Sequence, residues 1–325
     1  MNILRQLSRS ISSTILINVV LVVLWLMLAF WLTNEKNDAE IAIFNSFTLF
    51  SLPYFWGVIV QLICFTSLAF FAYKAIFLQY FTITTYLPFS ILMFFGTIFP
   101  SAHLFGNQTF ATMFLVLAIW QFIKIDNRRD NSAVVLNTFW LLILSAFFVP
   151  EFTFFVPVFI FGFLYFIELK IKMLMVVIFS ISIPVLSALG VCFLFDKIDL
   201  FSDFFIKIFN FNFEINIQIF EIKTVIFAAI SVFLVLISLL FYWQNIKNYK
   251  FQTRRFTLFF VILWLATIFL IMFLQSNFLN FILIYIILVS FFISLNFTNL
   301  RPKKVKQKKP KIRKLKMKRR KKINN

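Results

Sequence analysis

Ten apolar stretches of roughly 17 to 23 residues, joined by short polar segments, fill most of the first 300 residues. Such stretches match the hydrocarbon thickness of a bilayer, and backbone inside lipid must satisfy its hydrogen bonds locally, so each predicts a transmembrane helix. Only 13% of the residues are charged and 62% are hydrophobic, too few polar groups to cover a soluble core. The sequence therefore predicts an all-α, polytopic integral membrane protein with spans near 11–33, 55–73, 85–105, 108–124, 133–150, 152–169, 173–195, 224–243, 256–275 and 279–297.

An even number of spans places both termini on one side of the membrane. Ahead of residue 301, the side that holds the termini has 12 Lys and Arg, against 4 on the other side. Cytoplasmic segments of membrane proteins are enriched in these residues, so both termini are predicted to be cytoplasmic. Nine of the 12 acidic residues fall on the opposite side, where the loops near 34–54 and 196–223 are the longest.

The C-terminal segment 301–325 holds 15 of the 31 Lys and Arg and accounts for most of the net charge of +19. We expect it to be a tail without regular structure, separate from the helical domain 1–300. It contains no aromatic residue for base stacking, so sequence recognition of DNA is not expected. Anionic lipid headgroups, ribosomal RNA and an acidic membrane-protein partner all remain possible contacts. The predicted contact residues are Lys303, Lys304, Lys308, Lys309, Arg313, Lys314, Lys318, Arg319, Arg320, Lys321 and Lys322.

The first outside loop places three acids within six residues, namely Glu35, Asp38 and Glu40. Carboxylates in such a group can bind a metal ion or act as a general base. A loop that only keeps its charges in water is the simpler interpretation, since no second cluster accompanies it.

The second long outside loop begins with Asp196, Asp199 and Asp203, whose spacing places them on one face of a helix. The remaining faces carry Phe and Leu, which predicts a helix at the membrane interface; an acidic face that binds a cation or a partner is the alternative. Residues 209–219 then alternate strictly between polar and apolar side chains, the period of an extended strand.

His103 is the single histidine, at the outside end of the third span, and Glu151 lies in a tight outside turn where the two could pair. One histidine cannot build a multi-histidine metal centre, so we expect no metal site and no cofactor. Gln61 and Asn137 lie inside spans and are predicted to bond across helices. The 52 Phe are interpreted as lipid-facing bulk, with a Phe-lined channel as the alternative.

Two stretches resemble a known family. Tyr86-Leu87-Pro88 opens a span that ends near Phe99-Pro100, and Asn137-Thr138-Phe139-Trp140 leads to Phe147-Phe148-Val149-Pro150-Glu151. Over residues 74–195 this order resembles an uncharacterised family of bacterial polytopic inner-membrane proteins, often labelled β-carotene monooxygenases. The resemblance implies a bacterial inner-membrane location. The oxygenase label is rejected, because enzymes of that class resemble one another in holding iron with several histidines.

The chain also looks loosely like polytopic membrane glycosyltransferases that use lipid-phosphate sugar donors. That likeness implies a base in the first outside loop, which Asp38 or Glu40 matches, and an acceptor site in the later loop. The first function hypothesis is a non-enzymatic scaffold or accessory factor in envelope biogenesis, membrane-protein assembly or secretion. The second is a glycosyltransferase-like enzyme. A transporter is third, because no charged residue lies near the middle of a span.

Overall fold

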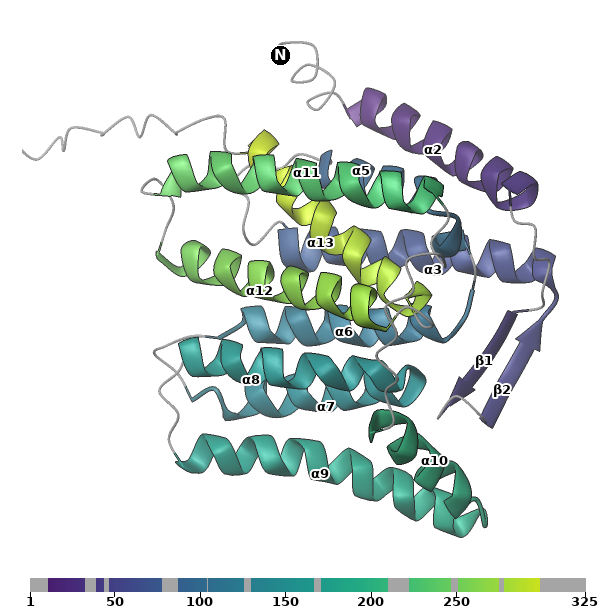
Figure 1. Ribbon diagram of the computed structural model, residues 1–325, viewed down its shortest axis with the longest axis vertical. Helices are drawn as coiled ribbons and strands as arrows, with labels where there is room; N and C mark the ends of the chain where they lie inside the picture. The colour runs from purple at the N-terminus through teal and green to yellow at the C-terminus, as the bar shows by residue number, and fades with distance from the viewer. Residues whose placement is uncertain are drawn as a thin grey trace, which may run out of the picture.

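A computed structural model describes residues 11–32, 39–43, 47–77, 87–103, 105–125, 130–166, 171–209, 222–246, 251–274 and 278–298. Helices dominate these residues and lie side by side, with α9 at one edge of the stack and α2 at the other (Figure 1). The helices are α2 (Ile11–Leu32), α3 (Tyr54–Ala72), α5 (Leu87–Ile98), α6 (Asn107–Ile123), α7 (Ser132–Phe148), α8 (Phe155–Phe166), α9 (Ile171–Leu194), α10 (Ile198–Phe209), α11 (Ile222–Gln244), α12 (Phe251–Phe273) and α13 (Leu279–Thr298).

A helix forms in each of the ten apolar stretches, and four helical stretches within the described residues are long and apolar enough to cross a membrane. These four are Tyr54–Phe77, Met173–Leu194, Val225–Gln244 and Thr253–Phe273. The first continues beyond α3 through a short π-helix, η1 (Tyr73–Phe77). The protein is thus a helical membrane protein. The number of spans and the side of the termini stay predictions.

Two of the expected spans are shorter as helices than the sequence indicated. Both α5 and α8 have 12 residues, about 18 Å at 1.5 Å per residue, against a hydrocarbon core of about 30 Å. Proline sets these limits, since Pro100 opens the 3₁₀ turn η2 (Pro100–His103) after α5, and Pro150 opens η3 (Pro150–Phe154) before α8. The turns η2 and η3 thereby hold the predicted site residues His103 and Glu151.

The last helix, α13, is at the centre of the bundle. Every residue from 281 to 292 is buried, and α13 contacts α5, α6, α11 and α12. A helix that is apolar on all faces has no polar side to give to water, so it is stable when other helices surround it. Figure 1 shows α13 crossing the neighbouring helices obliquely.

Phenylalanine rings fill much of the interior. Phe122 of α6 is fully buried and contacts a group of rings from α8 and α12, with centroid separations of 4.1 Å to Phe259 and 4.8 Å to Phe163. Gly162 provides room for this cluster, because a Cβ atom there would lie 2.8 Å from both Phe122 and Phe259. Many of the Phe side chains therefore pack helix against helix instead of facing lipid.

A β-hairpin that the sequence analysis missed connects α2 to α3. Strand β1 (Ala39–Ile43) pairs antiparallel with β2 (Phe47–Leu52), from Ala39 opposite Leu52 to Ile43 opposite Phe47. Ile and Phe alternate there with smaller residues, which is a pattern typical of a strand. The three nearby acids instead favoured the interpretation as a solvated loop. The extended segment expected at 209–219 lies outside the described residues, apart from Phe209 at the end of α10.

Helix α10 confirms the expected helix for Asp199 and Asp203, but Asp196 lies before it, in the turn that ends α9. Phe201 and Phe204 are buried, and the Phe204 ring lies 5.8 Å from that of Phe147 at the end of α7. The aromatic side of α10 therefore packs against the protein itself. The sequence had predicted that this side would insert among lipid headgroups. Asp199 and Asp203 are exposed on the outer side.

Candidate functional sites

One end of the bundle carries the β-hairpin, and we call it the hairpin end. Helix α7 ends there, while α6 and α13 begin there, and the hairpin and α10 lie at the same end (Figure 1). Strand β1 contacts both α6 and α7, and α10 contacts η3. Segments that are 100 or more residues apart in the sequence therefore meet at this end.

A polar pocket of about 250 Å³ opens at the hairpin end. Its polar side chains are Asn107 and Gln108 at the start of α6, Glu151 in η3 and Asn280 at the start of α13. Its walls are almost entirely polar, and Glu151 is only 7% exposed. Glu151 is the one buried carboxylate among the described side chains, because Asp130, Asp196, Asp199 and Asp203 are all exposed. The fold encloses Glu151 among amides.

His103 is buried at the same end but does not line the polar pocket. It is 1% exposed, and its ring lies edge-on to Trp25 of α2 with centroids 4.4 Å apart. Neither ring nitrogen has a hydrogen bond of good geometry. The expected pairing of His103 with Glu151 is not seen.

A buried hydrogen-bond network fixes the turn that carries His103. The Gln61 side chain of α3 donates from Nε2 to the Ala102 carbonyl at 2.7 Å, and its Oε1 accepts from Thr109 Oγ1 at 2.7 Å. One amide therefore joins α3, η2 and α6, which confirms the cross-helix role expected for Gln61. Asn137 was expected to act likewise, but it is exposed on α7.

The other predicted site residues are dispersed or undescribed. Glu35 and Asp38 lie outside the described residues, and Glu40 is described only as backbone of β1, opposite Ser51. The tail residues 301–325 also lie outside them. In the part of the chain that the structure describes, no three His, Cys, Asp or Glu side chains gather closely enough to hold a metal ion.

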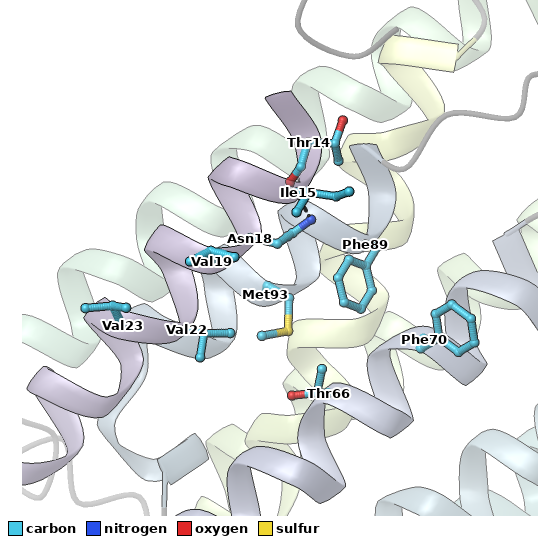
Figure 2. A pocket seen from close by; sticks show the side chains of 10 residues that line it. All are labelled: Thr14, Ile15, Asn18, Val19, Val22, Val23, Thr66, Phe70, Phe89 and Met93. Atoms are coloured by element: carbon cyan, nitrogen blue, oxygen red, sulfur yellow. Dashed lines mark hydrogen bonds between the residues drawn. The ribbon is translucent and has the colours of Figure 1, made fainter. Parts of the chain in front are cut away.

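An apolar groove of about 500 Å³ runs between α2, α3 and α5, and sequence reasoning did not find it. Figure 2 shows side chains of α2 along one wall, with Phe89 and Met93 of α5 and Thr66 and Phe70 of α3 across from them. The lining residues are Thr14, Ile15, Asn18, Val19, Val22, Val23, Thr66, Phe70, Phe89 and Met93.

A single amide provides the groove with a buried acceptor. Asn18 Nδ2 donates to the Thr14 carbonyl at 2.9 Å, which fixes the orientation of the amide, and its Oδ1 is buried without a hydrogen bond. A buried acceptor in this state costs about 1–3 kcal/mol unless a ligand or water donates to it. The groove can therefore hold a hydrocarbon chain and one hydroxyl or amine donor.

Comparison with known proteins gives no match: no family model, no curated protein and no solved structure is similar to this chain. The family resemblance over residues 74–195 accordingly stays a prediction. What the protein binds has to be argued from the groove and the pocket themselves.

Proposed function

We propose that the protein is a non-enzymatic accessory factor of envelope biogenesis in the bacterial inner membrane, and that it holds one membrane amphiphile in the apolar groove. It crosses the membrane ten times, with both termini in the cytoplasm. Its basic tail contacts anionic lipid headgroups, ribosomal RNA or a membrane-protein partner. The observation that carries the lipid-binding role is the apolar groove with its single buried acceptor.

The surroundings of the groove favour a lipid chain as its occupant. Val19 and Val23 on its rim are 56% and 51% exposed, and both belong to the predicted first span. An exposed apolar side chain within a span faces hydrocarbon, so the molecules that reach the groove are lipids. The α3 side belongs to Tyr54–Phe77, one of the four long apolar stretches.

The position of Asn18 sets where the polar part of the amphiphile lies. Asn18 is seven residues from the start of α2 at Ile11, about 10 Å along the helix axis. Because the N-terminus is predicted to be cytoplasmic, the donor of the amphiphile lies in the cytoplasmic leaflet. Fifteen basic residues of the tail are predicted on the same side, where each contributes on the order of 1 kcal/mol to holding anionic lipid nearby.

Photolabelling with a diazirine-bearing long-chain alcohol tests the groove. The purified full-length protein in lipid nanodiscs should be labelled on α2, α3 or α5. Val23→Trp fills the groove and should reduce this labelling at least fivefold. Val191→Trp on α9 is the matched control, because Val191 is 53% exposed and lines no part of the groove, and it should leave labelling unchanged. Equal labelling of the two variants would exclude the groove as the site.

A second probe tests the acceptor. The methyl ether of the same alcohol has no hydroxyl donor, so wild-type protein should prefer the alcohol by roughly threefold to tenfold, the range expected for one hydrogen bond. Asn18→Leu should remove the preference and keep the labelling. A preference that survives in Asn18→Leu would show that Asn18 does not bind the hydroxyl.

One observation favours the glycosyltransferase-like enzyme as a second candidate. Strand β1 carries Glu40 and contacts α6 and α7, the helices whose ends border the polar pocket. Under this candidate, Asp38 or Glu40 would be the base. Asp38→Asn combined with Glu40→Gln separates the candidates: a loss of cellular function with normal insertion supports the enzyme, and unchanged function supports the accessory factor.

A further inference from the structure

A basic side chain lies beside the apolar groove, at the end of the groove where α2 begins. The Nζ of Lys74 lies 4.6 Å from the centroid of the Phe70 ring, and Phe70 lines the groove on its α3 side (Figure 2). Thr14, three residues into α2, lines the same groove, so the end of α3 and the start of α2 lie together. The Phe70 ring therefore connects the apolar wall to a positive charge.

The backbone of α3 directs Lys74 toward the groove. Helix α3 continues without a break into η1, where Lys74 is the second residue, four positions after Phe70. Side chains four positions apart lie on the same face of a helix, so Lys74 projects from the face that borders the groove. Single π-helical turns such as η1 are frequent at functional sites.

The ammonium group of Lys74 is accessible to a ligand. Lys74 is exposed, and among the residues that the structure describes no acidic side chain pairs with it. The Phe70 ring attracts the charge through the face of its π-system, while a bound anion accepts hydrogen bonds from the ammonium N–H groups. Lysine stems lie along apolar surface and keep their charge at the polar boundary, so this ammonium marks the headgroup level of the groove.

An occupant of the groove therefore meets two polar groups with different requirements. The buried Oδ1 of Asn18 favours a hydrogen-bond donor, and the ammonium of Lys74 favours an anion. A fatty-acid carboxylate provides the anion without a donor, and a long-chain alcohol provides the donor without an anion. A lipid phosphate with a free hydroxyl near it provides both, and lysine is a common phosphate ligand.

We propose that the amphiphile of the groove is an anionic phospholipid with a free hydroxyl, such as a lysophospholipid, and that Lys74 binds its phosphate. This inference rests on the proposed function, because it requires a lipid chain in the groove. The chain lies among α2, α3 and α5, the hydroxyl donates to Asn18, and the phosphate lies beside Lys74 on the predicted cytoplasmic side. One charge at this level should favour the phosphate over an uncharged headgroup by roughly threefold to fivefold.

Competition for photolabelling tests the headgroup. The full-length protein in phosphatidylcholine nanodiscs is labelled with the diazirine-bearing long-chain alcohol, and unlabelled lipids compete with it. A monoacylglycerol and its phosphate, lysophosphatidic acid, share the chain and a glycerol hydroxyl but differ in charge. The phosphate should displace the label at a concentration at least about threefold lower. Equal potencies would overturn the phosphate assignment and leave the groove intact, whereas an absence of labelling on α2, α3 and α5 would overturn the proposed function as well.

The variants assign this preference to one lysine. Lys74→Gln should lower the ratio of the two potencies by roughly threefold to fivefold, and Lys74→Arg should retain most of it. Lys124→Gln is the matched control, because Lys124 is also exposed with its Nζ over an aromatic ring, that of Trp120, and lines no part of the groove. An unchanged ratio in Lys74→Gln, or an equal fall in the two Gln variants, would overturn the proposal.

A further arm separates a lipid phosphate from the free ion. Inorganic phosphate, added in excess at constant ionic strength, should neither displace the label nor weaken competition by lysophosphatidic acid, because only the lipid joins the charge to a chain. If excess phosphate removes the advantage of lysophosphatidic acid over the monoacylglycerol, Lys74 binds the free ion and the lipid assignment is wrong.

Discussion

The rings of Trp25 and His103 lie 4.4 Å apart at an interplanar angle of 64°, and this contact joins the first helix to the turn η2. Trp25 is fully buried and His103 is 1% exposed. The contact therefore holds η2 against α2 in the interior of the bundle.

The Gln61 network predicts a cost for removing one amide. Gln61→Leu would leave the Ala102 carbonyl and the Thr109 hydroxyl buried without this partner, and should destabilise the protein by about 2–4 kcal/mol. Chemical denaturation should show the loss. Adding Thr109→Val should cost less in the Gln61→Leu background than alone, because the hydroxyl has already lost its acceptor. Strictly additive costs would contradict the network.

Two glycines predict opposite results for the same substitution. Gly162→Ala places a methyl group 2.8 Å from the rings of Phe122 and Phe259, and should destabilise the protein by about 1–3 kcal/mol. Gly190→Ala in α9 meets no atom within 4 Å and should be neutral or stabilise by up to about 1 kcal/mol. Thermal unfolding of both variants checks this, and similar midpoints would refute the packing of the Phe122 cluster.

Asp196 predicts a helix-capping effect. Its φ of 51° is left-handed, and the Lys197 N–H donates to the Cys192 carbonyl at 2.8 Å, the arrangement in which glycine usually ends a helix. Asp196→Gly should therefore stabilise by roughly 0.5–1 kcal/mol. Asp199→Gly in the first turn of α10 should destabilise by about 0.5–1 kcal/mol, because it removes an acid that is favourable at the helix N-terminus. If Asp196→Gly instead destabilises the folded protein, the interactions of the aspartate side chain stabilise the fold by more than its left-handed backbone conformation costs.

The parts of the fold that depend on local composition could be predicted. Apolar stretches of span length predicted helices, and the spacing of the aspartates predicted a helix where α10 forms. Each of these follows from hydrogen bonding or periodicity within a short segment. The hairpin at 39–52 was missed because its five- and six-residue strands carry a weak signal beside three acids.

The candidate sites were less predictable. His103, Glu151 and the three aspartates were all predicted on the outside, but the fold buries His103 beside Trp25, encloses Glu151 among amides and leaves the aspartates exposed. The residues that line the pocket with Glu151 include Asn280, 129 residues further along the chain. No local pattern shows which distant segments share a cavity.

The sequence by itself determined that this chain forms apolar helices, because backbone in hydrocarbon has no other way to satisfy its hydrogen bonds. It did not determine which helix is central, since ten similar apolar segments have the same reason to enter a membrane. Tertiary packing decided this. Other helices surround α13, and Gly162 leaves room for the Phe122 cluster. Incomplete packing of α2 against α3 and α5 leaves the groove. Side-chain volume and steric fit, which act between segments distant in the chain, decided the sites.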